Sequence, residues 1–378
     1  YQGKTSGQYS DKSILSATLI DAGVGALNGT PVANASISFS LAGASAGSAT
    51  TDAAGVASGA FAMTHGAGSH PLLASFAGSN GYAASTATAT FFISREQGAL
   101  SVTSPGSSPL GSDANISVQV RELLVDGAEP MPNDGALPGD VGQVVAVGAT
   151  LRGVNTGIEV HANCGVGTGG TTSYASARTF NCAFSSASLV VDVYTLNVFL
   201  PGADPFYQAA DFMGNLSIFD PLGGASSGGG SFQLGGDRVT FAFHSKPQSN
   251  SQGPRSQLIV VRHLSTGGVC RLKSGDQMSP ANVSNNRVTL NGKGDYVCMD
   301  ATGRVTASAT DVNIWLIAED NGSPGTGADR IWVSNSAPVE SNMLDMPHPS
   351  NTNSAVLTGG NVTLHDKDTT TAAVRRRL

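Results

Sequence analysis

The first quarter of the chain alternates apolar and polar residues with a period of two. Residues 35–41 read ASISFSL, which places Ile37, Phe39 and Leu41 on one face of an extended segment and serines on the other. Such alternation predicts a half-buried β-strand. The pattern recurs in further runs separated by Gly, Asn and Asp turn residues: 14–20, 56–63, 72–76 and 87–93. Short strands at this spacing predict an all-β sandwich.

The same alternation predicts the core of this first sandwich. Apolar side chains at the inward positions of each strand are expected to pack together, away from water. The predicted core residues are Leu15, Ala17, Leu19, Ile37, Phe39, Leu41, Phe61, Leu73, Phe76 and Phe92.

The pattern of residues 1–96 recurs in an enlarged form over residues 97–221. Residues 69–93 match residues 192–219: in both, an alternating strand is followed by Gly, a short turn, Tyr and a final strand. An internal repeat of about 100 residues predicts tandem β modules, each with its own core. The second module is expected to be enlarged by insertions at 125–142 and 164–182.

Residues 222–335 predict a third β-rich domain. The Gly/Ser run at 223–230 predicts a flexible linker or a wide turn, and hairpin turns are expected at Gly267–Gly268 and at residues 292–294. Residues 336–378 predict an irregular linker, a final strand at 355–364 and a disordered tail.

The four cysteines predict two local disulfides, Cys164–Cys182 and Cys270–Cys298. Neither pair has the C-x-x-C spacing of a zinc or redox site, and each pair lies in its own strand-rich region. The loop-entropy model assigns each crosslink about 3 kcal/mol. A catalytic thiol near His161 is the weaker alternative. Disulfides favour an oxidising compartment, so we expect a secreted or cell-surface protein.

Composition and charge exclude several partners. The 378 residues carry a net charge of −7, with only 12% charged residues and no basic stripe, so nucleic acid is not expected as a partner. No run approaches the ~20 apolar residues of a membrane span. Tyr1 lies in a strand-like pattern without an initiating Met, which predicts a processed or excerpted product.

The motifs with catalytic associations lie in the wrong context. G-x-S-x-G occurs at 43–47 and 224–228, and G-x-G-x-x-G at 165–170, all in Gly-rich loops with no following helix. We therefore expect no enzymatic activity and no organic cofactor. Trp315 and Trp332 lie in apolar runs, so they are expected in the core rather than as platforms for sugars.

The strongest candidate metal ligands are acidic residues near the C-terminal end of the third domain. Carboxylate oxygens on loops bind Ca²⁺ in extracellular β modules. The candidates are Asp300, Glu319, Asp320 and Asp329. The alternative is that these groups cap turns or pair with Arg330, since no Asp-x-Asp-x-Asp loop is present.

Several segments resemble the bacterial Ig-like repeat of long secreted and surface proteins. They are TSGQYSDKSILSATLID (5–21), PVANASISFSL (31–41), SATTDAAGVASGAF (48–61) and ASFAGSNGYAAS (74–85), with Arg95–Glu96 at the position of an inter-repeat join. The end of the chain resembles the β domain that closes such arrays. Those runs are SFQLGGDRVTFAFHSK (231–246), SQLIVVRHLSTGGVCRLKS (256–274), AEDNGSPGTGADRIWV (318–333) and GGNVTLHD (359–366).

The resemblance implies tandem Ig-like sandwiches, a third β-rich domain and a C-terminal tail. It implies a non-catalytic structural or adhesive role at a bacterial surface, and supplies no catalytic residues. A carbohydrate-binding or accessory region of a larger secreted enzyme is the alternative. The expected partners are copies of the same chain, neighbouring repeats, and a glycan or host surface.

The sparse surface charge also favours self-association, because few charges need to be desolvated. A strand at 355–364 on a tether would either pair with an open edge of a neighbouring subunit or close its own domain. The first alternative predicts head-to-tail association with residues 336–364 at the contact. The second predicts a local strand only.

Overall fold

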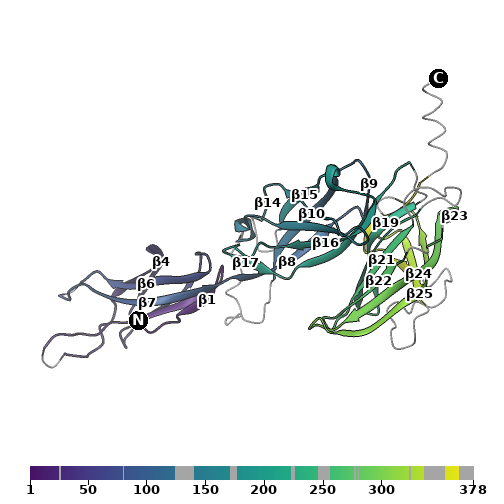
Figure 1. Cartoon of the computed structure of the whole chain (residues 1–378). Helices are drawn as coiled ribbons and strands as arrows, with labels where there is room; N and C mark the ends of the chain where they lie inside the picture. Colours follow the sequence, from purple (N-terminus) through teal and green to yellow (C-terminus); the bar gives the residue numbers. More distant parts are fainter. Residues whose placement is uncertain are drawn as a thin grey trace, which may run out of the picture.

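The chain forms three β-rich units in a row along an elongated molecule (Figure 1). The computed structural model describes residues 1–24, 27–79, 81–123, 140–170, 177–222, 226–245, 256–275, 278–279, 281–322, 325–335 and 354–365. We call residues 1–95 unit one, 96–222 unit two and 226–365 unit three. In this described part, the helical segments are two short 3₁₀ turns, Asp140–Gln143 and Ser186–Ser188. The predicted all-β class is confirmed.

Unit one is a sandwich of two sheets. One sheet has the order β1-β7-β6-β3-β4 and the other pairs β2 with β5. β1 and β7 are parallel, and the other pairs are antiparallel. The strands are β1 (Ser6–Gln8), β2 (Lys12–Thr18), β3 (Ser36–Leu41), β4 (Ala44–Thr50), β5 (Val56–Ala62), β6 (Gly68–Phe76) and β7 (Ser85–Ser94).

The predicted core of unit one is correct for most strands. The buried members of that list are Leu15, Ala17, Ile37, Phe39, Leu41 and Phe76, while Leu19 and Phe61 are partly buried. The prediction is wrong for Leu73 and Phe92, which do not belong to the buried face of their strands. In β6 and β7 the buried residues are their neighbours Leu72, Phe91 and Ile93, and Phe92 is 51% exposed. Consecutive apolar residues leave the inward face undecided, so a one-residue error in register is easy there.

Unit two repeats the strand order of unit one and adds to it. Its sheet β9-β18-β16-β11-β12 has the order of β1-β7-β6-β3-β4, including the parallel pair at one edge, β9 with β18. The second sheet, β13-β15-β10-β8-β17 with β14 on β15, enlarges the smaller sheet of unit one. The strands are β8 (Glu96–Thr103), β9 (Ser107–Pro109), β10 (Ala114–Glu122), β11 (Gly148–Gly153), β12 (Glu159–His161), β13 (Asn163–Cys164), β14 (Thr168–Gly169), β15 (Arg178–Phe184), β16 (Asp192–Phe199), β17 (Tyr207–Ala209) and β18 (Phe212–Phe219).

Unit three is one antiparallel sheet with the order β27-β26-β25-β24-β22-β21-β20-β19-β28, with β23 on β24. Its interior holds a second large apolar cluster that includes Phe241, Leu272 and Val333. The strands are β19 (Ser226–Leu234), β20 (Asp237–Ser245), β21 (Gln257–His263), β22 (Val269–Ser274), β23 (Asn282–Ser284), β24 (Arg287–Met299), β25 (Val305–Glu319), β26 (Arg330–Asn335), β27 (Ala355–Val356) and β28 (Gly359–Leu364).

The segment at 355–364 closes this sheet on itself. β27 pairs with β26, and two residues later β28 pairs with β19, the strand at the opposite end of the sheet. Between them, the Thr358 N–H donates to the Ser231 carbonyl at 2.8 Å. Of the two sequence alternatives, the local one describes the structure. The rest of the predicted contact segment, 336–353, and the predicted tail from 367 lie outside the described residues, as does most of the 125–142 insertion.

Two predicted turns in unit three are wrong. Residues 292–294 lie inside β24, at a register shift between Gly294 and Tyr296, so the glycine marks a bulge rather than a hairpin. The Gly/Ser run expected as a linker contributes residues 226–230 to β19, where Ser226–Gly229 is buried. Gly is favoured here because other backbone segments approach β19 too closely for a side chain.

Candidate functional site

Units one and two are joined without a linker. β7 ends at Ser94 and β8 begins at Glu96, and the Ala67 N–H of unit one donates to the Pro205 carbonyl of unit two at 2.7 Å. The Tyr9 ring of unit one packs on Phe206 of unit two, with ring centroids 4.7 Å apart. Backbone and aromatic contacts therefore fix how these two units are oriented.

Units two and three meet along β18, which packs against β19 and β20. A small apolar cluster at this joint combines Val193 of unit two with Ala242 and Ile259 of unit three, all fully buried. The backbones also approach closely at Gly106 and Gly229, where a β-carbon on either residue would overlap the carbonyl oxygen of the other. The two backbones are therefore in direct contact at this joint, beside a small buried apolar cluster.

Polar side chains cross the same joint. Asn215 Nδ2 donates to Thr240 Oγ1 at 3.0 Å, and both residues are buried. Arg238 of β20 donates from Nη1 to the Met213 carbonyl at 2.8 Å and lies over the Phe212 ring, 4.5 Å from its centroid. Burial lowers the pKa of Arg238. Hydrogen bonds depend on orientation, so these contacts fix the position of unit three relative to unit two, which apolar packing alone would not determine.

A further contact comes from a loop held by a buried carboxylate. Asp192 accepts hydrogen bonds from Asn155, from Thr156 N at 2.9 Å and Thr156 Oγ1 at 2.7 Å, and from Val193 N at 2.8 Å. This fixes residues 153–157, and the Val154 carbonyl there accepts from Lys273 Nζ of unit three at 2.8 Å.

The last described residue, His365, also returns to unit two. Its ring stacks on Phe219, with centroids 4.4 Å apart, and its Nε2 lies 3.1 Å from Ser227 Oγ. Burial lowers the pKa of His365, while the Asp320 carboxylate acts in the opposite direction. The neutral imidazole is therefore the form that fits this joint.

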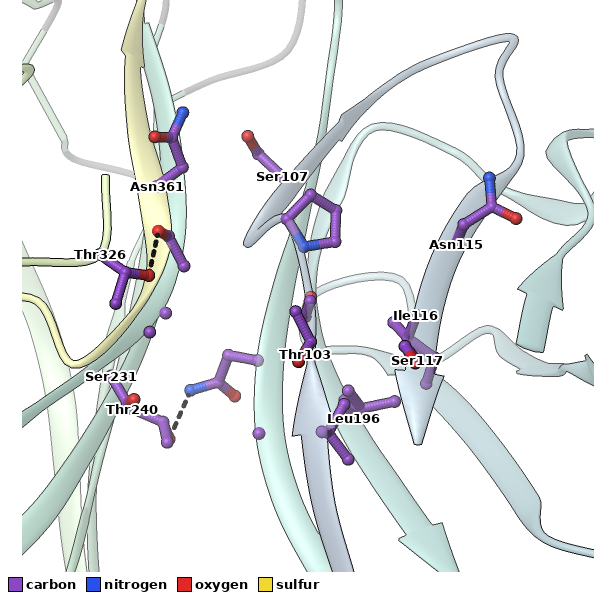
Figure 2. A pocket seen from close by; sticks show the side chains of 18 of the residues that line it. Thr103, Ser107, Asn115, Ile116, Ser117, Leu196, Ser231, Thr240, Thr326 and Asn361 are labelled. Carbon is purple, nitrogen blue, oxygen red and sulfur yellow. Dashed lines mark hydrogen bonds between the residues drawn. The ribbon is translucent and has the colours of Figure 1, made fainter. Parts of the chain in front are cut away.

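A cleft of about 1060 Å³ opens beside this joint. Thr103, Ser117 and Leu196 of unit two lie on one side, and Ser231 and Thr240 of unit three on the other (Figure 2). Most polar side chains that line it are Ser, Thr or Asn. Of the lining residues that the structure describes, Arg238 is the charged one, and the lining cysteine, Cys182, is in a disulfide. The cleft is therefore suited to a ligand rich in hydroxyl groups.

The predicted disulfides are both confirmed. Cys164 is bonded to Cys182, and Cys270 to Cys298. Each bond links residues directly opposite each other on paired strands, β13 with β15 and β22 with β24. Two disulfides indicate a compartment outside the reducing cytosol. None of the helical segments in the described residues has the length and apolar character needed to cross a membrane.

The structure does not assemble the four calcium candidates. Asp300 caps its own turn through Thr302 and Arg304, and Glu319 pairs with Arg287. Asp320 and Asp329 instead hold the closing strand: Asp329 accepts from Val362 N at 2.7 Å, and Asp320 from Leu364 N at 3.2 Å. Burial raises the pKa of Asp329. Among the described residues, no group of three acidic, His or Cys side chains is arranged to hold a metal ion.

The two tryptophans differ from each other. Trp332 is buried, as expected, but Trp315 is 38% exposed, so its placement in the core was wrong. In β25 the buried residues are the alternate ones, Ile314 and Leu316. Sequence reasoning also missed the cleft and Arg238. The available signal was the run of small residues from Ser226, which is typical of close backbone contact.

Comparison with known proteins identifies no family. No protein-family model matches the chain, and no curated protein matches its sequence. InvD of Yersinia pseudotuberculosis is 11% identical, with 94% of this chain and 96% of that chain covered and a TM-score of 0.21. Dpr2 Ig1–Ig2, solved with DIP-Theta Ig1–Ig3, is 8% identical, with 57% and 94% covered and a TM-score of 0.19. For the beta-glucuronidase of Parabacteroides merdae the identity is 11%, the coverage 56% and 22%, and the TM-score 0.15. The chain thus spans about a fifth of that enzyme, and likeness at this level carries no argument about function.

Proposed function

We propose that this chain is a stiff, non-catalytic spacer and adhesive region of a bacterial secreted or surface protein. The observation that carries the proposal is that both joints are packed. Unit one passes into unit two across the single residue Arg95, and units two and three share the contacts of Gly106, Asn215 and Arg238.

Rigid joints matter because they convert a row of small domains into a rod. Domains joined by free linkers are expected to move relative to one another, unless their interface is large and well packed. Here aromatic, apolar and polar groups all cross the joints, so bending would break several kinds of contact together. The two disulfides suit a protein that works outside the cytosol.

Distance measurements between spin labels test the spacer function. Labels are introduced on unnatural amino acids, so that the disulfides stay intact, at Thr88 in unit one and Thr306 in unit three, both exposed. A stiff rod gives one narrow distance distribution by pulsed electron paramagnetic resonance. A broad distribution at neutral pH would refute the proposal.

A second candidate function is saccharide binding in the cleft between units two and three. Its lining of hydroxyl and amide side chains over an apolar floor favours this function, because sugars present both hydroxyl groups and apolar faces. Saturation-transfer difference NMR with a panel of oligosaccharides tests it. Transfer to no member of the panel would exclude this candidate and leave the spacer function standing.

A further inference from the structure

One wall of the cleft presents a cation, Arg238, for which the described residues supply no counter-charge. Arg238 makes a single hydrogen bond from its guanidinium within the described residues, to the Met213 carbonyl, and no described carboxylate lies within ion-pair distance. A guanidinium has five N–H donors. Most of the donors of Arg238 are therefore left for another partner, in a half-buried place where an unpaired charge is costly.

The charge of the surroundings makes this cation distinctive. The whole chain has a net charge of −7, yet none of the described residues that line the cleft is Asp or Glu. The cleft is thus a locally electropositive place in an acidic protein, and it favours a ligand with negative charge.

The opposite wall presents a row of uncommitted polar groups. Thr103, Ser117 and Asn181 are register partners on the adjacent strands β8, β10 and β15. Neighbouring strands lie about 4.8 Å apart, so the three side chains form a straight row across the sheet. In the part of the chain that the structure describes, none of these side chains makes a hydrogen bond, although all three line the cleft.

We propose that the cleft binds an acidic oligosaccharide, such as a chain of uronic acids. Arg238 pairs with a sugar carboxylate, for which its fork of donors is matched. The row of Thr103, Ser117 and Asn181 bonds to sugar hydroxyl groups. Apolar side chains that line the cleft and keep some exposure, including Val102 and Pro105, contact the faces of the rings. The volume of about 1060 Å³ suits several sugar units rather than a single ion. This inference rests on the second proposed function and adds the charge of the ligand.

Calorimetric titration with matched ligands tests the proposal. The probes are the tetrasaccharides of galacturonate, of guluronate and of hyaluronan, and the fully methyl-esterified form of each, which keeps the sugar but removes the charge. The variants are Arg238→Gln, Asn181→Ala and, as a control, Arg271→Gln, an exposed arginine of the same unit outside the cleft.

We expect at least one acid tetrasaccharide to bind, and its methyl ester to bind at least about 10-fold more weakly, as for loss of one charge-assisted hydrogen bond. Arg238→Gln should weaken acid binding to the level of the ester, Asn181→Ala should weaken both forms, and Arg271→Gln should change neither. Within the described residues the Asn181 side chain makes no hydrogen bond across the joint, so Asn181→Ala reports on the ligand even if Arg238→Gln disturbs the joint.

Equal binding of acid and ester, or acid binding that survives Arg238→Gln, would overturn the acidic specificity while leaving saccharide binding intact. Wild-type affinity in Asn181→Ala would remove the proposed site from the cleft. Failure of all probes to bind would overturn both the inference and the second proposed function. The spacer function is independent of all these outcomes, because it is measured by distances between units.

Discussion

Gly106 of unit two and Gly229 of unit three are in backbone contact, and neither position has room for a β-carbon. Gly106 also has a φ of +77°, which favours glycine for a second reason. Gly229 has no such backbone requirement, so its close approach to the other unit is what excludes a side chain there. This pair therefore offers a direct way to open one joint without changing the core of either unit.

Gly229→Ala should separate units two and three. The added methyl group must displace the backbone at Gly106, at a cost of about 1–3 kcal/mol as in overpacked cores. The distance distribution between labels at Thr88 and Thr306 should broaden. Gly202→Ala is the matched control, because no atom lies within 4 Å of a β-carbon at that position. An unchanged distribution in Gly229→Ala would show that this contact does not hold the joint.

Asp192→Asn should destabilise unit two and loosen the same joint. The carboxylate accepts from Asn155, Thr156 and Val193, and an amide would turn one of its acceptor oxygens into a donor that faces other donors. We expect a loss of about 2–3 kcal/mol, measured as a lower melting temperature by calorimetry. Asp211→Asn, at an exposed carboxylate bonded to Asn197, is the control and should change the melting temperature little. Equal effects of the two variants would contradict this role.

The local strands were readable from sequence wherever polar and apolar residues strictly alternate. In residues 36–41 the alternation of Ser with Ile37, Phe39 and Leu41 predicts both the strand and its buried face. In residues 91–93, Phe-Phe-Ile is apolar throughout, and only the pairing of β7 with β6 decides that Phe92 faces outward. The sequence pattern identifies the buried face of a strand only when one face is apolar and the other is polar.

The joints and the cleft lay beyond such reasoning for a different physical reason. The residues there are mostly Gly, Ser, Thr and Asn, which have no distinctive sequence pattern. They come from segments as distant as Thr103 and Asn361, so they form a site only when the two units pack together. Ser226–Gly230 has the composition of a linker, but it forms a strand because β28 and the Gly106 loop approach its backbone. By contrast, the disulfides were predictable because each joins cysteines close in sequence.

The joint between units two and three should weaken in mild acid. Burial lowers the pKa of His365 below its ordinary value of 6.5, so the folded state favours the neutral ring on Phe219. Above 6.5 both folded and unfolded states are neutral and the full stability is present. As the pH falls below 6.5 and through the folded pKa, the unfolded state binds the proton first, and stability is lost. His263 has a pKa lowered in the same direction.

The melting temperature of unit three should therefore fall between about pH 7 and pH 5. His365→Phe keeps a ring that can stack on Phe219 but cannot titrate, so it should reduce this slope, with the remainder due to His263. His161→Phe, at a largely exposed histidine of unit two, is the control and should leave the slope unchanged. A slope in His365→Phe equal to that of the wild type would show that this histidine does not carry the pH dependence.

Deletion of residues 354–378 should unfold unit three and leave units one and two folded. The deletion removes Leu357 and Val362 from the core, which are 1% and 0% exposed, and it removes the strand that joins β19 to β26. It also takes the Val362 N–H from the buried carboxylate of Asp329, which keeps the Asn321 N–H but loses one of its hydrogen bonds, and such a loss is costly in a buried place. We expect the backbone amides from β19 onward to lose their protection from hydrogen exchange, while those of β3 and β16 keep theirs.

Deletion of residues 366–378 alone retains β27, β28 and His365, and is the matched control. If the longer deletion keeps native protection throughout unit three as a monomer, the closing strand is dispensable. If it does so only as a dimer, strands from a second copy can replace it, and the head-to-tail alternative regains support.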